Sequence, residues 1–141
     1  MVSTFLTAAL LVTCASVAPA GQVRRPANAT LFLESLTGRD SFEFYCASCH
    51  GSTGKGDGPV ASSLKMRPAD LTLLTRRNGA TFPRQRVVSL VTGTEPGLAA
   101  VHGSSEMPVW GPVFRFIDPS DARVKQRIEN VVTYIETLQL K

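Results

Sequence analysis

Two cysteines and a histidine, Cys46, Cys49 and His50, lie within five consecutive residues of this 141-residue chain. On a helix, two thiols at this spacing are separated by about one turn. They can therefore add to the two vinyl groups of one haem, and a histidine directly after them can offer an imidazole nitrogen to the iron. Cys-x-x-Cys-His is the pattern of covalent haem attachment. The sequence predicts one covalent haem c, with Cys46 and Cys49 as its attachment points and His50 as the proximal iron ligand.

Other kinds of site also use a Cys-x-x-Cys pair. A thioredoxin-like redox centre expects a strand-helix-strand setting, and no such setting is visible in the sequence. A structural zinc site needs a second pair of ligands at metal spacing. Besides the motif, the chain offers His102 and some carboxylates, which do not form such a pair.

A haem iron in this pattern usually takes a second axial ligand, and three residues are candidates: Met66, His102 and Met107. Methionine paired with histidine raises the reduction potential. A second histidine would lower it, and His102 would then be the ligand. The residue types alone leave all three open.

Four segments resemble the class I c-type cytochromes, the small bacterial monohaem family. They are residues 46–51, 54–59, 67–71 and 107–111, and the likeness runs from about residue 39 to the end. The resemblance implies an all-α cytochrome c fold of three to four helices, with long loops wrapped round one covalent haem. It also implies that Met107 is the distal iron ligand.

The function that this resemblance implies is outer-sphere transfer of single electrons between exported or membrane-bound redox partners. Such a carrier is not an enzyme, because both axial positions of the iron are filled. Two alternatives stay open. The chain is a fixed haem subunit of a larger dehydrogenase or terminal oxidase, or it is a haem enzyme or sensor with an open iron site, which requires Met107 not to be bound.

The family also implies finer contacts. A proline carbonyl accepts the second N–H of the ligating histidine, which leaves Pro59 and Pro68 as candidates. The first and last helices cross through a glycine and an aromatic residue, here Gly38 and Tyr134. Two further aromatic residues, Tyr45 and Trp110, either shield the haem, bond a propionate or belong to the ordinary core.

Helical spacing predicts the elements that position these residues. A first helix over residues 39–48 places two aromatic residues and both cysteines on one face. Residues 51–69 and 97–111 are expected to be irregular, since Gly and Pro recur in them. Residues 85–92 suit a short helix that stops at Gly93.

The last helix is the clearest in the sequence. Asp118 is expected to cap it and Pro119 to take its first position. An apolar stripe at helical spacing follows, made of Val124, Ile128, Val131, Val132, Ile135 and Leu138.

The amino terminus is typical of an exported chain. Residues 5–12 are almost all apolar and residues 18–20 read Ala-Pro-Ala, which predicts a signal peptide over residues 1–20. Cleavage leaves a lead-in at residues 21–30 and a cytochrome c domain over residues 31–141. The expected location is the periplasm. Lipidation at Cys14 is the alternative, and it would add a membrane anchor.

Basic residues are concentrated after the haem motif. Residues 51–90 hold seven Lys and Arg against two Asp, a net charge of +5 in a chain whose total is +4. This excess is either a solvated surface or a docking patch for an acidic redox partner. Nucleic acid is not an expected partner, because the chain is exported and has no binding motif. The seven residues are Lys55, Lys65, Arg67, Arg76, Arg77, Arg84 and Arg86.

Overall fold

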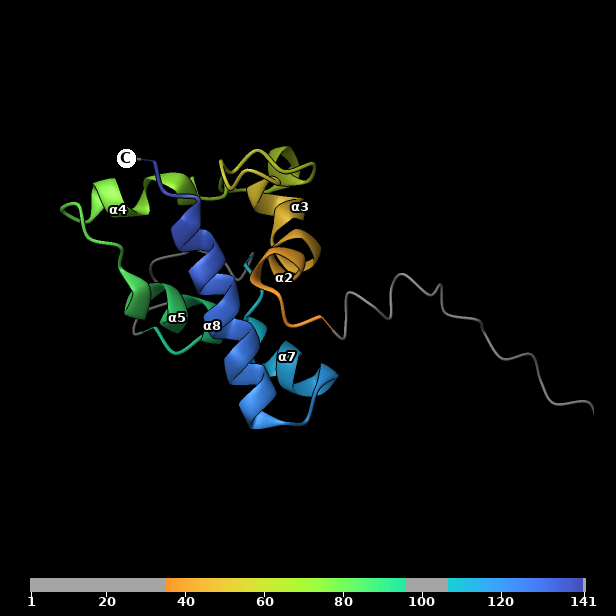
Figure 1. Cartoon of the computed structure of the whole chain (residues 1–141). Coiled ribbons are helices and arrows are strands. Elements are labelled where there is room, and N and C mark those ends of the chain that lie inside the picture. The colour runs from red at the N-terminus through yellow and green to blue at the C-terminus, as the bar shows by residue number, and fades with distance from the viewer. Residues whose placement is uncertain (1–34, 96–106, 141) are drawn as a thin grey trace, which may run out of the picture.

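The computed structural model describes residues 35–95 and 107–140, and within these ranges the chain is all-helical, without strands (Figure 1). The predicted all-α class is confirmed. The expected number of three to four helices is too low, because six α-helices and two 3-10 turns occur in the described ranges. They are α2 (Gly38–Tyr45), α3 (Ala47–His50), η1 (Ala61–Ser63), η2 (Leu71–Leu73), α4 (Leu74–Arg77), α5 (Arg84–Thr92), α7 (Trp110–Ile117) and α8 (Asp121–Thr137).

Some predictions fall on residues outside the described ranges. These are the signal peptide over residues 1–20, the lead-in over residues 21–30, lipidation at Cys14 and the candidate ligand His102. Among the residues that are described, no helix is long and apolar enough to cross a membrane.

The longest of the described helices, α8, packs against α2, α5 and α7 (Figure 1). Its predicted apolar stripe is buried from Val124 to Ile135, and Leu138 is the C-cap. The predicted start at Asp118 is wrong. The Asp118 carboxylate accepts a hydrogen bond from the Ser120 amide at 3.0 Å and forms a turn before the helix. The helix therefore begins two residues later than predicted, with Ser120 as its N-cap and Asp121 as its first residue.

The crossing of α2 and α8 depends on Gly38, as the sequence predicted. A Cβ atom added at Gly38 would lie 2.0 Å from the carbonyl oxygen of Asn130 and 2.9 Å from the Cβ of Tyr134. The Asn130 side chain also donates to the carbonyl of Leu36 at 2.6 Å. One turn further along α2, the rings of Phe42 and Tyr134 meet with centroids 5.3 Å apart. The two backbones therefore approach closely, and only glycine fits at this position.

The first predicted helix is two helices in the structure. Thr37 caps α2, because its side chain accepts from the amide of Asp40 at 3.1 Å. At Cys46 the backbone turns (φ −112°, ψ −35°), and the single turn of α3 follows up to His50. The interruption falls at the first cysteine of the haem motif, so Cys46 is both the C-cap of α2 and the N-cap of α3.

The predicted helix over residues 85–92 is confirmed as α5, and Gly93 ends it in the left-handed conformation. Helix α7 was missed, since Gly111 and Pro112 lie in its first turn and indicated a loop. Proline is tolerated there because the first amides of a helix have no partner within it.

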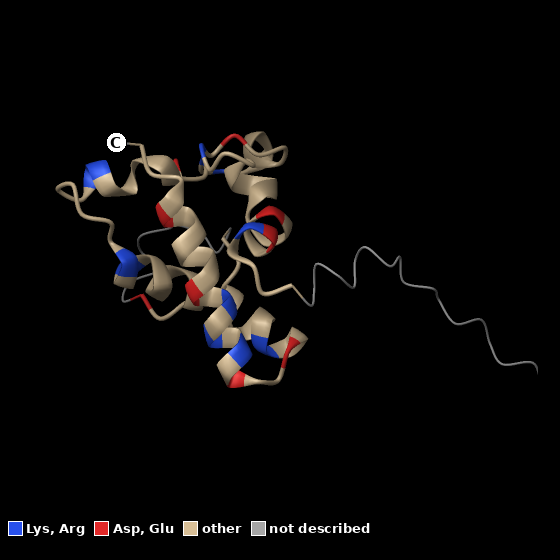
Figure 2. Ribbon diagram, viewed as in Figure 1, with Lys and Arg blue, Asp and Glu red and all other residues tan. Residues whose placement is uncertain are grey.

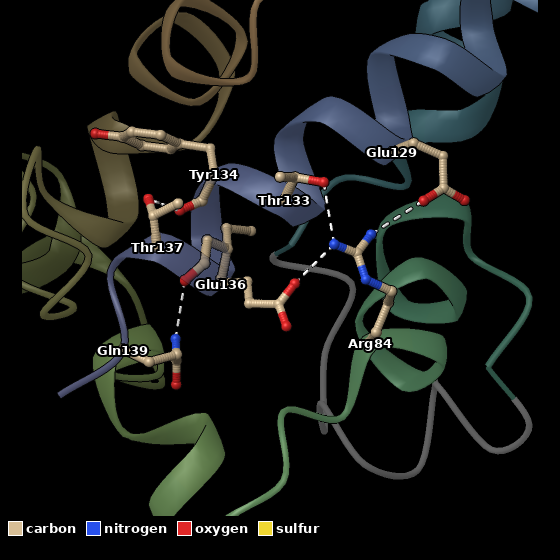
Figure 3. A network of polar contacts seen from close by, with 8 residues as sticks. Arg84, Glu129, Thr133, Tyr134, Glu136, Thr137 and Gln139 are labelled. Carbon is tan, nitrogen blue, oxygen red and sulfur yellow. Dashed lines mark hydrogen bonds and ion pairs between the residues drawn. The ribbon is translucent and has the colours of Figure 1, made fainter. Parts of the chain in front are cut away.

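Helices α5 and α8 are joined by Arg84, whose guanidinium reaches three side chains of α8 (Figure 3). It pairs with Glu129 at 3.2 Å and with Glu136 at 2.7 Å, and it donates to Thr133 at 3.0 Å. The residues are partly exposed, and exposed pairs of this kind stabilise a protein modestly. Arg84 is therefore a link between helices with its charge paired.

The glycine at the helix crossing can be tested directly. Gly38→Ala places a methyl group against a backbone carbonyl that cannot move without shifting α8. We expect the free energy of unfolding to fall by about 1–3 kcal/mol, as for other overpacked positions, measured by chemical denaturation with circular dichroism. Arg39→Ala, at the exposed neighbouring position, should leave the midpoint nearly unchanged. Equal effects of the two substitutions would contradict the close crossing.

Candidate functional site

The three residues of the predicted haem motif are held by one tight turn. The carbonyl of Cys46 accepts hydrogen bonds from the amides of Cys49 at 3.2 Å and His50 at 2.9 Å. Both cysteines are half-buried, and neither forms a disulfide. The turn therefore sets two thiols and an imidazole in a fixed order at the end of α3.

The imidazole of His50 is oriented by the segment that follows the loop. Its Nδ1 lies 3.0 Å from the carbonyl oxygen of Ala69. A carbonyl only accepts, so Nδ1 carries the hydrogen and Nε2 keeps a lone pair for a metal. Burial lowers the pKa of His50, partly opposed by the bond to Ala69. The ring is accordingly a neutral imidazole, the form that binds iron.

The expected proline acceptor is wrong, since neither Pro59 nor Pro68 bonds His50. The carbonyl of Pro68 faces Gly56 instead, where an added Cβ would lie 2.2 Å from that oxygen. With this carbonyl directed toward the loop, the next one along the chain, that of Ala69, reaches the ring. The prediction missed the acceptor by one residue.

The glycine-rich loop completes the end of α3. The amides of Gly56, Gly58 and Val60 donate to the carbonyls of His50 at 2.8 Å, Cys49 at 3.1 Å and Ser48 at 3.1 Å. These are carbonyls that the short helix cannot satisfy itself. The sequence indicated a loop here but not its task, which is to fix the helix that carries the motif.

The contact between the glycine-rich loop and α3 requires glycine, since a Cβ added at Gly58 would lie 2.3 Å from the carbonyl oxygen of Ser48. The loop is also tied to η2, because the amide of Leu71 donates to the carbonyl of Gly54 at 2.7 Å. The loop and the Ala69 segment thus hold the motif from two sides.

The environment of Cys46 disfavours thiolate chemistry. Burial, with a smaller contribution from Cys49, raises the pKa of the Cys46 thiol to about 12. Disulfide exchange and metal binding both use the thiolate, which is scarce at neutral pH under these conditions. Within residues 35–95 and 107–140, no group of three or more His, Cys, Asp and Glu side chains is arranged to hold a metal ion. A redox dithiol and a zinc site are both poorly supported.

The other predicted ligand, Met107, is half-buried at the start of the segment that leads into α7. Three residues later the ring of Trp110 meets that of Tyr45, with centroids 5.3 Å apart. Tyr45 directly precedes Cys46, so this contact connects the Met107 segment to the haem motif. Met66, by contrast, is 51% exposed in the loop after η1.

Tyr45 lies at the centre of a cluster of aromatic rings. Besides Trp110, its ring meets Phe114 with centroids 5.0 Å apart, and the rings of Trp110 and Phe114 stack at 5.9 Å. Within the described part of the chain, the hydroxyl of Tyr45 is buried without a hydrogen-bond partner, and burial raises its pKa. A buried hydroxyl without a hydrogen-bond partner lowers the stability of the fold. This hydroxyl belongs to the residue directly before the first cysteine.

Some residues of the predicted basic patch are paired with carboxylates. Lys and Arg are spread over α4, α5, α7 and α8 (Figure 2). Of the seven residues in the predicted patch, Arg84 pairs with Glu129 and Glu136, and Arg86 pairs with Glu95 at 3.3 Å. The exposed pair Arg76 and Arg77 on α4 follows the segment that contacts His50.

Comparisons with known proteins give no relative. No protein-family model matches the chain, and neither a curated protein nor a solved structure matches it. Every functional statement therefore depends on the residues and contacts of this chain.

The raised pKa of the Cys46 thiol gives a prediction for the chain expressed without haem. In a Cys14→Ser, Cys49→Ser variant, Cys46 is the one remaining cysteine. Because its thiol stays protonated when folded, alkylation by iodoacetamide at pH 8 should be at least roughly a hundredfold slower than in urea, as followed by mass spectrometry. Circular dichroism confirms that the variant is helical without urea. Equal rates in the helical and the urea-unfolded chain would contradict the assignment.

Proposed function

We propose that this chain is a monohaem c-type cytochrome of the all-α cytochrome c fold that carries single electrons between redox partners. The observation that carries the proposal is the fixed turn of Cys46, Cys49 and His50, with the His50 ring oriented by the Ala69 carbonyl. This arrangement suits attachment of one haem at two thiols with a neutral imidazole beside them. When bound, the haem supplies an iron that gains or loses one electron.

Each residue of the motif has a defined part in this proposal. Cys46 and Cys49 would hold the haem through two thioether bonds, because an S–H group can add across a vinyl group, with the sulfur bonding to one vinyl carbon and the hydrogen going to the other. The high pKa of Cys46 is compatible with this addition, since the whole S–H group is consumed. His50 offers Nε2 to the iron while Nδ1 stays bonded to Ala69.

The residues around the motif also fit a haem. The donors are two uncharged thiols and a neutral imidazole, and Met107 adds a soft, uncharged thioether suited to iron. The crossing at Gly38 matches the helix contact that the family resemblance implied.

As a carrier, the chain would transform no substrate at the iron, since His50 and Met107 would both be bound to it. The proposed location is the periplasm, on the strength of the predicted signal peptide over residues 1–20, with membrane association if Cys14 is lipidated. The proposed partners are redox proteins that meet the exposed basic residues.

One observation favours a second role, that of a fixed haem subunit in a larger oxidoreductase. Helix α7 and the residue before it expose three apolar side chains at helical spacing: Val109 (38%), Val113 (36%) and Phe116 (91%). Exposed apolar side chains of this kind occur at sites where proteins interact. Co-elution of the native protein with a large assembly on gel filtration would favour the subunit, and elution as a monomer would favour a free carrier.

The proposal is tested by covalent haem. Expressed with a haem-attachment system, the chain should gain the mass of one haem, which stays bound after denaturation in acid and acetone. A variant with both Cys46→Ala and Cys49→Ala should lose the covalent haem, while Cys14→Ser should keep it. Absence of covalent haem in the wild-type chain would overturn the proposal.

The surface charge gives a second prediction. The ferrous protein should reduce ferricyanide more slowly as ionic strength rises, because exposed charges are screened. Replacing Arg76 and Arg77 with Gln should lower the low-salt rate about twofold or more. As a control with the same change in net charge, Arg115 and Lys125, on α7 and α8, are replaced with Gln. If the two double substitutions lower the rate equally, or if the rate does not depend on salt, the arginines of α4 do not steer ferricyanide to the protein.

A further inference from the structure

We propose that Tyr45, Trp110 and Gly93 are positioning residues that hold the segment carrying Met107 against the haem motif. This inference rests on the proposed function and deepens it. It concerns how strongly the chain can keep a methionine ligand in place, which the identity of the ligands does not determine.

One side of the Met107 segment is fixed by the end of α5. A Cβ added at Gly93 would lie 2.1 Å from Cγ1 of Val109, two residues after Met107. A Cβ added at Gly111 would likewise lie 2.8 Å from the carbonyl oxygen of Thr92. Two glycines thus allow the segment to pack directly on the last turn of α5.

The other side is fixed by the aromatic contact with α2. The rings of Trp110 and Tyr45 meet edge to face, with centroids 5.3 Å apart and an angle of 60° between the ring planes. Tyr45 is 7% exposed and Phe114, packed against both rings, is 2% exposed. This contact therefore lies at a well-packed place in the core and cannot shift without moving α7.

The two contacts together hold a segment that lies far along the chain from the motif. Met107 is 57 residues after His50 in sequence, yet Trp110 contacts the residue directly before Cys46. A ligand attached to a held segment has a high effective concentration at its binding partner. Releasing the segment on one side should lower the effective concentration of Met107 at the iron. A competing ligand should then displace Met107 more easily.

The experiment measures imidazole binding to the ferric haem-loaded protein, followed by loss of the weak far-red absorption band that methionine-ligated ferric haem shows. Tyr45→Leu and Trp110→Leu should each tighten imidazole binding about tenfold, in line with the energy of a buried aromatic pair. Trp110 is half-exposed, so its variant decides the question if Tyr45→Leu fails to fold.

Two matched controls separate positioning from general stability. Tyr45→Phe keeps the ring and removes only the hydroxyl. Phe42→Leu breaks the ring contact with Tyr134, which has the same centroid distance of 5.3 Å but involves no residue of the Met107 segment. Both controls should bind imidazole within about twofold of the wild type, although Phe42→Leu should lower the free energy of unfolding.

The inference is overturned if Tyr45→Leu and Trp110→Leu change imidazole affinity no more than Phe42→Leu, because the rings then act only on stability. It is also overturned if Tyr45→Phe has the full effect, because the hydroxyl and not the packing would then be responsible. A wild-type affinity equal to that of Met107→Leu means that Met107 is not the ligand. In that case the axial pair of the proposed function fails, and this inference fails with it.

Discussion

The close crossing of α2 and α8 at Gly38 is the constraint on which the site depends. With no side chain at Gly38, the two backbones approach until its Cα lies against the carbonyl of Asn130. That approach brings Phe42 onto Tyr134 and buries Tyr45 among the rings of α7. The position of Cys46 at the end of α2 follows from it, and the candidate haem motif is built outward from this helix pair.

The motif itself is held more by backbone hydrogen bonds than by side-chain packing. Helix α3 is a single turn, too short to be stable alone. Its carbonyls are satisfied by the amides of the glycine loop, and the ring of His50 by the carbonyl of Ala69. A loop with few apolar side chains can perform this task because glycine lets its backbone approach closely. In the described part of the chain, the long loop after the motif therefore has a structural role, because its amides hold α3 in place.

Sequence reasoning succeeded where a pattern has one physical meaning. The apolar stripe of α8 from Val124 to Ile135, the stop at Gly93 and the crossing at Gly38 were predicted and are confirmed. It failed where tertiary contacts decide. Hydrogen bonds around Asp118 displaced the start of α8, and α7 forms despite Gly111 and Pro112 because Trp110 and Phe114 bury their rings against Tyr45. The acceptor for His50 depends on the direction of single carbonyls, which residue types do not encode.

We propose one covalent haem whose iron is bound by His50 and Met107, and the visible absorption spectrum of the oxidised protein is the sharpest test of this proposal. His50 and Met107 as ligands predict a low-spin spectrum with a weak far-red band that is lost in Met107→Ala and kept in Met66→Ala and His102→Ala. Loss of the low-spin spectrum in His102→Ala, with no far-red band in the wild type, would contradict the assignment of Met107. A high-spin wild-type spectrum would contradict the electron-carrier account and favour an open iron site.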